Sequence, residues 1–138
     1  MKTNYILKID ELNTLIEDLK DSFYDGVIVL EGDLASGKTT FVKEFVKSLG
    51  IDECVTSPTF SLQQCYADKI FHYDIYNHGL EHFVSLGMLE ELERTGVHFI
   101  EWGDERLIEI LKHSGIDVMK IEIEKIAHDK REYKICTY

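Results

Sequence analysis

Hydrophobic residues recur along the first third of the chain at two spacings, and each spacing predicts one kind of element. Within residues 11–20, leucine and isoleucine occupy positions i, i+3, i+4 and i+7, which is typical of a helix with one apolar face, and Asp10 is placed to cap it. Residues 27–30 form a short apolar run with β-branched members, as in a buried strand. Phenylalanine and valine then return at helical spacing over residues 38–49, and Gly50 is the expected end of that helix.

Strand patterns dominate the middle of the chain. Residues 60–66 and 69–75 both favour strands, and the polar pair at 67–68 between them predicts an antiparallel hairpin. A helical pattern follows over residues 79–94, and Gly87 predicts a break within it.

The last third continues the alternation. An apolar strand pattern covers residues 97–100, and a helix is expected to begin after its cap at Asp104. Alternating residues predict a strand over 118–126 that pairs back with residues 132–137, and the polar mixture at 128–131 is expected to form the turn. Together these patterns predict an α/β fold with a mixed, mostly parallel sheet flanked by helices and extended by antiparallel hairpins.

Composition and charge narrow the class of protein. A length of 138 residues with 44% hydrophobic residues is enough for one packed core, so a single domain over residues 1–138 is expected. The net charge of −11 repels phosphate backbones and therefore disfavours tight binding of nucleic acid by the chain alone. Without an apolar run of about 18 residues or a charged-then-apolar leader, we expect a soluble cytoplasmic protein with no membrane contact. Its three scattered cysteines are expected to be reduced thiols.

The stretch GDLASGKTTF carries the clearest chemistry. It fits the pattern G-x-x-x-x-G-K-[ST] of a phosphate-binding loop, and it lies between a predicted strand and a predicted helix, as that loop requires. Glycines allow successive backbone N–H groups to point at an anion, and the helix N-terminus adds positive charge. Lys38 is expected to reach the β- and γ-phosphates, and the Thr39 hydroxyl to coordinate Mg²⁺. The residues expected to contact the nucleotide here are Gly32, Ala35, Ser36, Gly37, Lys38, Thr39 and Thr40.

Ala35 is the unusual position of this loop, because many such loops carry glycine there. Alanine tolerates a positive φ poorly, so either this residue keeps a right-handed conformation or the turn is slightly strained. We do not expect either outcome to abolish nucleotide binding.

Absent motifs separate the classes of nucleotide-dependent protein. The chain has no N-K-x-D string, which a GTP-dependent switch would need to recognise guanine. Kinases of small molecules close an arginine-bearing lid over the transferring phosphoryl group, whereas this chain has three dispersed arginines, Arg94, Arg106 and Arg131. These absences favour an ATPase that works with other proteins.

Four further strings, in order along the chain, indicate a family. They are TSPTF at residues 56–60, HYDIY at 72–76, LGM at 86–88 and IEW at 100–102. With the phosphate loop in front of them, this ordered set resembles the TsaE-type ATPases, formerly YjeE, which support threonylcarbamoyladenosine formation in bacterial tRNA. The similarity runs from residue 10 to about residue 125.

The resemblance implies a small P-loop NTPase-like fold, ATP and Mg²⁺ as cofactors, and weak hydrolysis that depends on partner proteins. The implied partners are TsaD-type and TsaB-type subunits, with tRNA reached only through them. Members of the family are thought to reset that complex between rounds. The alternatives left open are a small-molecule P-loop kinase and a nucleotide-dependent interaction module without useful hydrolysis.

Three polar residues outside the loop complete the expected site. By resemblance, Thr59 lies in a switch-like loop as a sensor of the γ-phosphate. Asp74 and Glu101 each end a predicted strand, where a carboxylate can hold Mg²⁺ or orient the attacking water. We expect Asp74, Glu101 and Lys38 to be catalytic and Thr39 and Glu101 to bind the metal. The sequence leaves open whether Asp74 or Glu101 is the direct ligand.

Other residues receive a structural interpretation. Trp102 is expected to pack or to contact a partner. His72, His78 and His82 invite comparison with a metal site, but a solvated helix face is favoured over zinc. Many relatives have arginine after the tyrosine of HYDIY, whereas this chain has Asn77, so any contact made by that arginine is not expected here.

Overall fold

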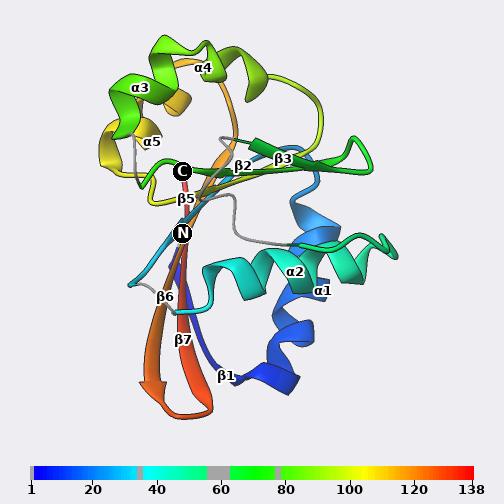
Figure 1. Ribbon diagram of the computed structural model, residues 1–138. Helices are drawn as coiled ribbons and strands as arrows, with labels where there is room; N and C mark the ends of the chain where they lie inside the picture. Colours follow the sequence, from blue (N-terminus) through cyan, green and yellow to red (C-terminus); the bar gives the residue numbers. More distant parts are fainter. Residues whose placement is uncertain (1, 34–35, 56–62, 77–78) are drawn as a thin grey trace.

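The computed structural model describes residues 2–33, 36–55, 63–76 and 79–138. Seven strands of this described part form one sheet. They are β1 (Lys2–Lys8), β2 (Gly26–Glu31), β3 (Gln63–Tyr66), β4 (Ile70–Asp74), β5 (Val97–Glu101), β6 (Val118–Ala127) and β7 (Lys130–Thr137). Their order across the sheet is β1-β7-β6-β2-β5-β4-β3 (Figure 1).

Parallel pairing is confined to the centre of the sheet. Strand β2 pairs in parallel with β5 and β6, and β5 pairs in parallel with β4. The outer pairs β3–β4, β6–β7 and β1–β7 are antiparallel. The predicted α/β fold with a mixed sheet and antiparallel hairpin additions is therefore confirmed.

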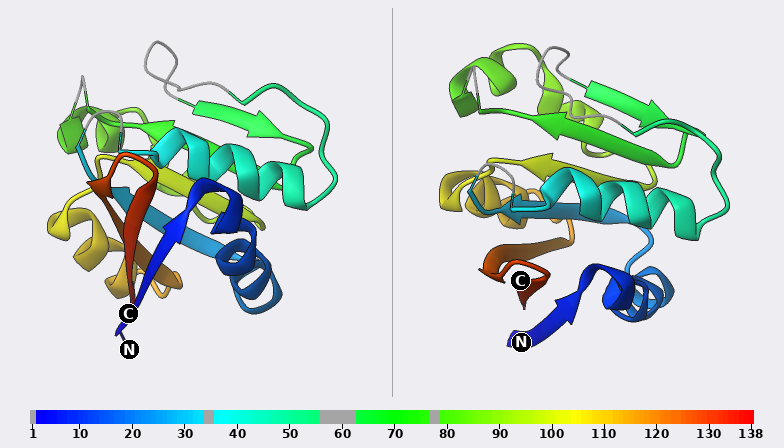
Figure 2. Two further views of the ribbon diagram at one scale, coloured as in Figure 1. Left: turned by 90° about the horizontal axis from the view of Figure 1, so that it is seen from below. Right: turned by 60° about the horizontal axis from the view of Figure 1, so that its bottom comes forward.

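Helices cover both faces of this sheet (Figures 1 and 2). Helices α1 (Leu12–Ser22) and α2 (Lys38–Ser48) pack in one hydrophobic cluster with side chains of β2, β5 and β6. Helices α3 (Gly79–Ser85) and α5 (Glu105–His113) contribute to a second cluster on the opposite face, with α4 (Met88–Glu91) at its border. No helix in the described parts of the chain has the length and apolar character needed to cross a membrane.

The two predicted N-caps have different outcomes. Asp104 caps α5, because its Oδ1 accepts a hydrogen bond of 3.1 Å from the backbone N–H of Leu107. The prediction that Asp10 caps the first helix is wrong, since Asp10 lies inside a short 3₁₀ turn, η1 (Ile9–Glu11), that precedes α1. There Oε1 of Glu11 accepts a hydrogen bond of 2.8 Å from the backbone N–H of Lys8, so a glutamate side chain closes the turn.

Two turns follow their sequence signals. Residues 67–68 have φ values of 52° and 53°, so the β3–β4 hairpin turns through two left-handed residues, as strand twist requires. Gly87, with φ of 76°, breaks the predicted helix 79–94 into α3 and α4. Residues 60–62 of the predicted strand lie outside the described residues.

Strand β1 was not predicted. It pairs with β7 along its whole length, from Lys2 with Cys136 to Lys8 with Lys130. Only its alternate residues Tyr5 and Leu7 pack against the core, so an edge strand with one half-buried row carries a weak pattern. The backbone pairing with β7, at the other end of the chain, stabilises this strand where its own apolar pattern is weak.

A buried chain of hydrogen bonds crosses β3, β4 and β5 on the face of α3 and α5. His98 Nε2 lies 2.7 Å from the carbonyl oxygen of Arg94, and a carbonyl only accepts, so Nε2 carries the hydrogen. His98 Nδ1 therefore accepts from the Tyr73 hydroxyl at 2.8 Å. Gln63 Nε2 donates in turn to the tyrosine oxygen at 3.1 Å. This chain fixes a neutral histidine in the core.

We predict that His98 makes the protein sensitive to mild acid. Burial lowers the pKa of His98 from 6.5, and the nearby carboxylates of Asp25 and Glu91 oppose that shift only in part. The unfolded chain thus binds a proton near pH 6.5, whereas the folded chain binds it only at lower pH. The free energy of unfolding should fall as the pH drops through that window.

Urea unfolding at several pH values between neutral and mildly acidic tests this for wild type and His98→Gln. The wild type should lose more stability on acidification than the variant, whatever the variant's stability at neutral pH. Equal losses in the two proteins would show that His98 does not carry the effect.

Candidate nucleotide site

The register of the central strands brings the predicted site together. In the parallel pairs, Leu30 on β2 lies opposite Glu101 on β5, and Glu101 lies opposite Asp74 on β4. The predicted phosphate loop leaves β2 just after this point and enters α2. The loop and both carboxylates therefore meet at the carboxyl edge of the parallel strands, where α/β proteins bind their ligands.

Two glycines shape the described part of the loop. Gly37 has φ of 114° and stands immediately before α2, so the chain turns there through a conformation that favours glycine. At Gly32, φ is 155°, and an added Cβ atom would lie 2.5 Å from the carbonyl oxygen of Ile123 and 2.6 Å from Ser36 Oγ. A side chain at position 32 would force the loop off β6. Ala35 lies outside the described residues, so the expectation about its conformation stays a prediction.

Lys38 is buried under the loop that precedes it. Its Nζ donates to the carbonyl oxygens of Gly32 at 2.6 Å and Asp33 at 3.0 Å, and it lies 4.1 Å from the centroid of the Trp102 ring. Burial lowers the pKa of Lys38, and nearby carboxylates, that of Glu101 most of all, oppose the shift. Carbonyls, an aromatic face and acids together surround one ammonium group.

Thr39 and Glu101 are in direct contact. The Thr39 hydroxyl donates to Glu101 Oε2 at 3.0 Å, and the glutamate is 3% exposed. Thr39 lies in the first turn of α2, whereas Glu101 ends β5, so the contact joins the start of that helix to the sheet edge. The two residues predicted to bind the metal are thus neighbours.

Asp74 lies beside them at the end of β4 and is 8% exposed. Its Oδ1 accepts the backbone N–H of Tyr76 at 2.9 Å. The structure thus brings together Lys38, Thr39, Glu101 and Asp74, whereas Thr59 lies outside the described residues. Thr40 follows in the first turn of α2, half-buried.

His72 corrects the expectation of a solvated histidine face. It lies on β4, is fully buried, and places Nε2 2.5 Å from Glu101 Oε2. His82 is exposed on α3, as expected, and His78 lies outside the described residues. Among the described residues, no group of three or more His, Cys, Asp or Glu side chains could hold a metal ion.

Trp102 has an unusual backbone. Its φ of 69° is a left-handed conformation that bulky residues rarely adopt, and such positions cluster at functional sites. Its ring covers Lys38 and contacts the ring of Tyr76 at a centroid distance of 4.6 Å. The expectation of a packing role for Trp102 is confirmed, because it also packs against the hydrophobic cluster of α3 and α5.

Arg131 is a residue of the loop region that sequence reasoning missed. The turn between β6 and β7 takes only residues 128–129 of the expected 128–131, because β7 already begins at Lys130. Arg131 follows it, and its Nε donates to the carbonyl oxygen of Ser36 at 3.0 Å. No local signal could have found this contact, because it depends on the β6–β7 hairpin lying beside the loop.

The hydroxyl of Ser36 is a buried polar group of the loop that lacks a hydrogen-bond partner among the described residues. Ser36 is 4% exposed, and its Oγ has no hydrogen-bond partner in the described structure. Leaving such a group unpaired costs about 1–3 kcal/mol. An unpaired buried donor next to a helix N-terminus is the feature of this loop that fits a phosphate oxygen.

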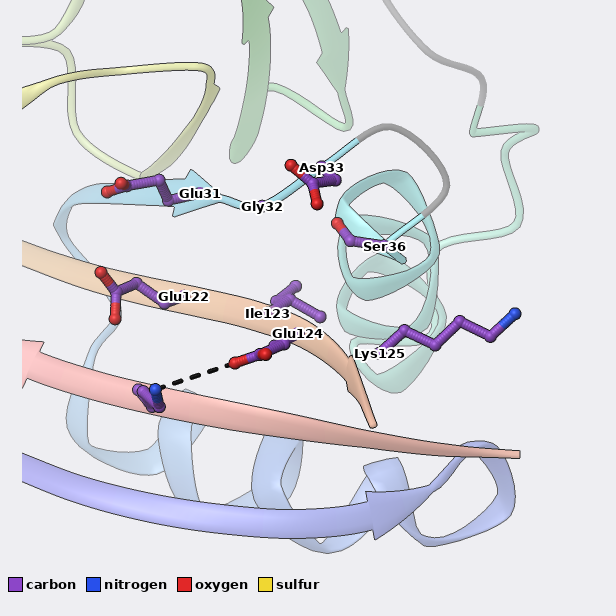
Figure 3. A pocket seen from close by; sticks show the side chains of 9 residues that line it. Glu31, Gly32, Asp33, Ser36, Glu122, Ile123, Glu124 and Lys125 are labelled. Carbon is purple, nitrogen blue, oxygen red and sulfur yellow. Dashed lines mark ion pairs between the residues drawn. The ribbon is translucent and has the colours of Figure 1, made fainter. Parts of the chain in front are cut away.

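A groove of about 670 Å³ runs along the other side of the loop, between Gly32 and β6 (Figure 3). Its charged lining is mostly acidic, with Glu31, Asp33, Glu122 and Glu124 against Lys125 and Lys134. Lys134 is also 3.8 Å from Glu124. Ser36 lines this groove as well, and the excess of acidic side chains disfavours an anion within the groove itself.

Comparison with known proteins adds a family to this geometry. A family model described as "Threonylcarbamoyl adenosine biosynthesis protein TsaE" matches residues 7–133. The tRNA threonylcarbamoyladenosine biosynthesis protein TsaE of Treponema pallidum is 38% identical over 112 residues, which cover 79% of this chain and 80% of that protein. The protein of the same name from Bacillus subtilis is 36% identical over 113 residues, 74% of this chain and 71% of that one.

A solved structure agrees with the sequence comparisons. The crystal structure of YdiB from Bacillus subtilis superposes with a TM-score of 0.70 at 29% identity, covering 98% of this chain and 84% of that one. The likeness extends over the whole sheet and both helical layers.

We predict that Trp102, the only tryptophan, reports ligand binding at Lys38. A phosphate that binds Lys38 must draw its ammonium from the Trp102 ring, which alters the electrostatic field on the indole. Titration with a nucleoside triphosphate should therefore change the tryptophan emission in a saturable way. Lys38→Met should lose this change, whereas Lys43→Met, on the exposed face of the same helix, should keep it. An unchanged titration of Lys38→Met would exclude the lysine from the binding event.

Proposed function

Since the chain belongs to the TsaE family of threonylcarbamoyl adenosine biosynthesis proteins, we propose that it is the Mg²⁺-dependent ATPase of that process. Family membership places it in the biosynthesis of threonylcarbamoyladenosine in tRNA. The proposal adds the nucleotide, the metal and the hydrolytic reaction. The contact between Thr39 and Glu101, at the N-terminus of α2, is the observation that carries it.

Three features of the loop suit a triphosphate. The N-terminus of α2, which begins at Lys38, directs the backbone N–H groups of its first turn and a positive dipole end toward the loop. Lys38 provides a cation that can exchange the carbonyls of Gly32 and Asp33 for phosphate oxygens. Ser36 Oγ supplies a buried hydroxyl that still needs a partner.

Thr39 and Glu101 fit a magnesium ion bound with the nucleotide. A hydroxyl and a carboxylate are hard oxygen ligands, and Mg²⁺ takes few protein ligands when substrate phosphates complete its shell. When bound, the ion neutralises charge on the β- and γ-phosphate oxygens. Because Thr39 gives its hydrogen to Glu101, its oxygen lone pairs remain for the metal. This geometry favours Glu101 over Asp74 as the acid nearest the ion.

Asp74 is then the residue that orients the attacking water. It lies in register with Glu101 on the neighbouring strand, so its carboxylate is at the same edge of the sheet. Its backbone-bound Oδ1 is held by Tyr76 N–H, which fixes the direction of the carboxyl group. Holding a water in line with the γ-phosphate lowers the barrier chiefly through positioning.

The proposed partners are TsaD-type and TsaB-type subunits, which would stimulate weak hydrolysis and be reset by it. The net charge of −11 supports an indirect relation to tRNA, because an acidic surface repels the phosphate backbone. Arg131 does not favour the kinase alternative, since its Nε is bound to the loop backbone at Ser36. It holds the loop and does not form a lid.

We predict that Lys38→Ala weakens ATP binding with the fold intact. Losing a charge-assisted contact of about 1.5–3 kcal/mol should raise the dissociation constant roughly 10- to 100-fold. Isothermal titration calorimetry with ATP and Mg²⁺ measures this. Binding equal to that of the wild type would remove Lys38 from the phosphate site.

We further predict that Asp74→Asn keeps ATP binding and lowers turnover. The amide preserves the size of the side chain but not its charge, so the water is held less well, and hydrolysis should fall roughly 100-fold or more. Phosphate release is measured with and without purified TsaB-type and TsaD-type partners. If neither mixture hydrolyses ATP, or if the phosphoryl group goes to an acceptor other than water, the proposed ATPase is overturned.

A further inference from the structure

His72 is a fully buried histidine whose presence the proposed reaction does not explain. It lies opposite Phe99, which belongs to the hydrophobic cluster of α1 and α2, yet its ring carries two polar nitrogens. Nε2 contacts Glu101 Oε2, and Nδ1 has no hydrogen-bond partner among the described residues. An apolar side chain of similar size would avoid the unpaired nitrogen, so packing alone does not account for a histidine at this position.

The sheet register explains how His72 reaches the carboxylate. On β4, His72 lies opposite Phe99, and Asp74 lies opposite Glu101. His72 is therefore the diagonal neighbour of Glu101 on the same face of the sheet, within reach of a long side chain. Strand β4 thus places two residues next to Glu101, because positions two apart share a face. Asp74 lies directly opposite it and His72 lies diagonally.

The hydrogen-bond directions around Glu101 are set by its chemistry. An ionised carboxylate only accepts, so the contact with His72 requires the hydrogen on Nε2. Thr39 donates to the same oxygen, Oε2. Within the described residues, both donors hold that one oxygen and no hydrogen bond is made to Oε1, which leaves Oε1 for a ligand.

The Glu101 carboxylate needs more than one hydrogen-bond donor to keep a fixed orientation at this position. Glu101 lies directly opposite Asp74 on the neighbouring strand, and like charges in directly opposite positions repel. A glutamate side chain also has three rotatable bonds, so without a second donor it could turn away from Thr39. Two donors from different elements, α2 and β4, restrict it to one orientation.

We propose that His72 is a positioning residue that locks Glu101 in the orientation required for the metal–nucleotide complex. This inference rests on the proposed function, because it assumes that Glu101 belongs to the metal site. His72 touches neither nucleotide nor metal and acts only through Glu101. Its removal should therefore weaken metal binding more than it weakens binding of the nucleotide alone.

The experiment compares two polar substitutions of different reach. In His72→Gln the amide nitrogen can reach the position of Nε2, whereas in His72→Asn it is too short to contact Glu101. Mn²⁺ binding in the presence of excess ADP is followed by electron paramagnetic resonance, and ADP affinity is measured separately without metal. His72→Asn should lower Mn²⁺ affinity roughly 10- to 100-fold, as loss of a ligand-orienting contact does, and His72→Gln should restore most of it.

His98 provides the matched control. It is as fully buried as His72 and lies on the adjacent strand, but its ring is on the opposite face of the sheet and bonds to Tyr73 and Arg94. His98→Asn should destabilise the fold and leave the Mn²⁺ affinity of the folded protein within about twofold of wild type. Urea unfolding of every variant shows that the binding measurements are made on folded protein.

The outcomes separate the inference from the proposed function. Wild-type Mn²⁺ affinity in His72→Asn, or an equal loss in His72→Asn, His72→Gln and His98→Asn, overturns the positioning role while leaving the ATPase proposal in place. A wild-type protein that binds ADP but no Mn²⁺ overturns the metal site itself. Loss in His72→Asn with recovery in His72→Gln supports the role.

Discussion

The parallel pairing of β2, β5 and β4 is the constraint on which the candidate site depends. It places Glu101 between Leu30 and Asp74, next to the point where the loop leaves β2. Thr39, 62 residues before Glu101 in the chain, meets it only because α2 starts at this edge. A shift of register by one residue would turn both acids to the other face of the sheet. The chemistry of the site is therefore a consequence of strand pairing.

The two-residue period of β4 lets one strand serve the site and the core at once. His72 and Asp74 point to the face of α2, whereas Phe71 and Tyr73 pack in the cluster of α3 and α5. The polar residues on the site face are compensated by aromatic packing next to them, where Phe41 and Phe45 contact the ring of Phe99. Buried apolar area on both faces supports a strand that carries two buried polar side chains.

Local pattern predicted much of this molecule, and long-range pairing decided the rest. The break at Gly87 and the cap at Asp104 follow from residues within one or two turns. The contacts of Arg131 with Ser36 and of His72 with Glu101 each join residues far apart in sequence. The motif HYDIY predicted a site residue at Asp74 but not the contact of His72 with Glu101, since only the parallel register makes the two residues neighbours.

The position of Lys38 limits how tightly this loop can bind an anion. Its ammonium already has two carbonyl partners and an aromatic face, so a bound phosphate would have to replace these contacts and would not simply add to them. Burial, which lowers the pKa of Lys38, makes its charged form dependent on such partners. The acids at Glu101 and Asp74 stabilise that charge and at the same time repel the phosphates. A divalent cation held by Thr39 and Glu101 would offset this repulsion, so nucleotide and metal are expected to bind here together.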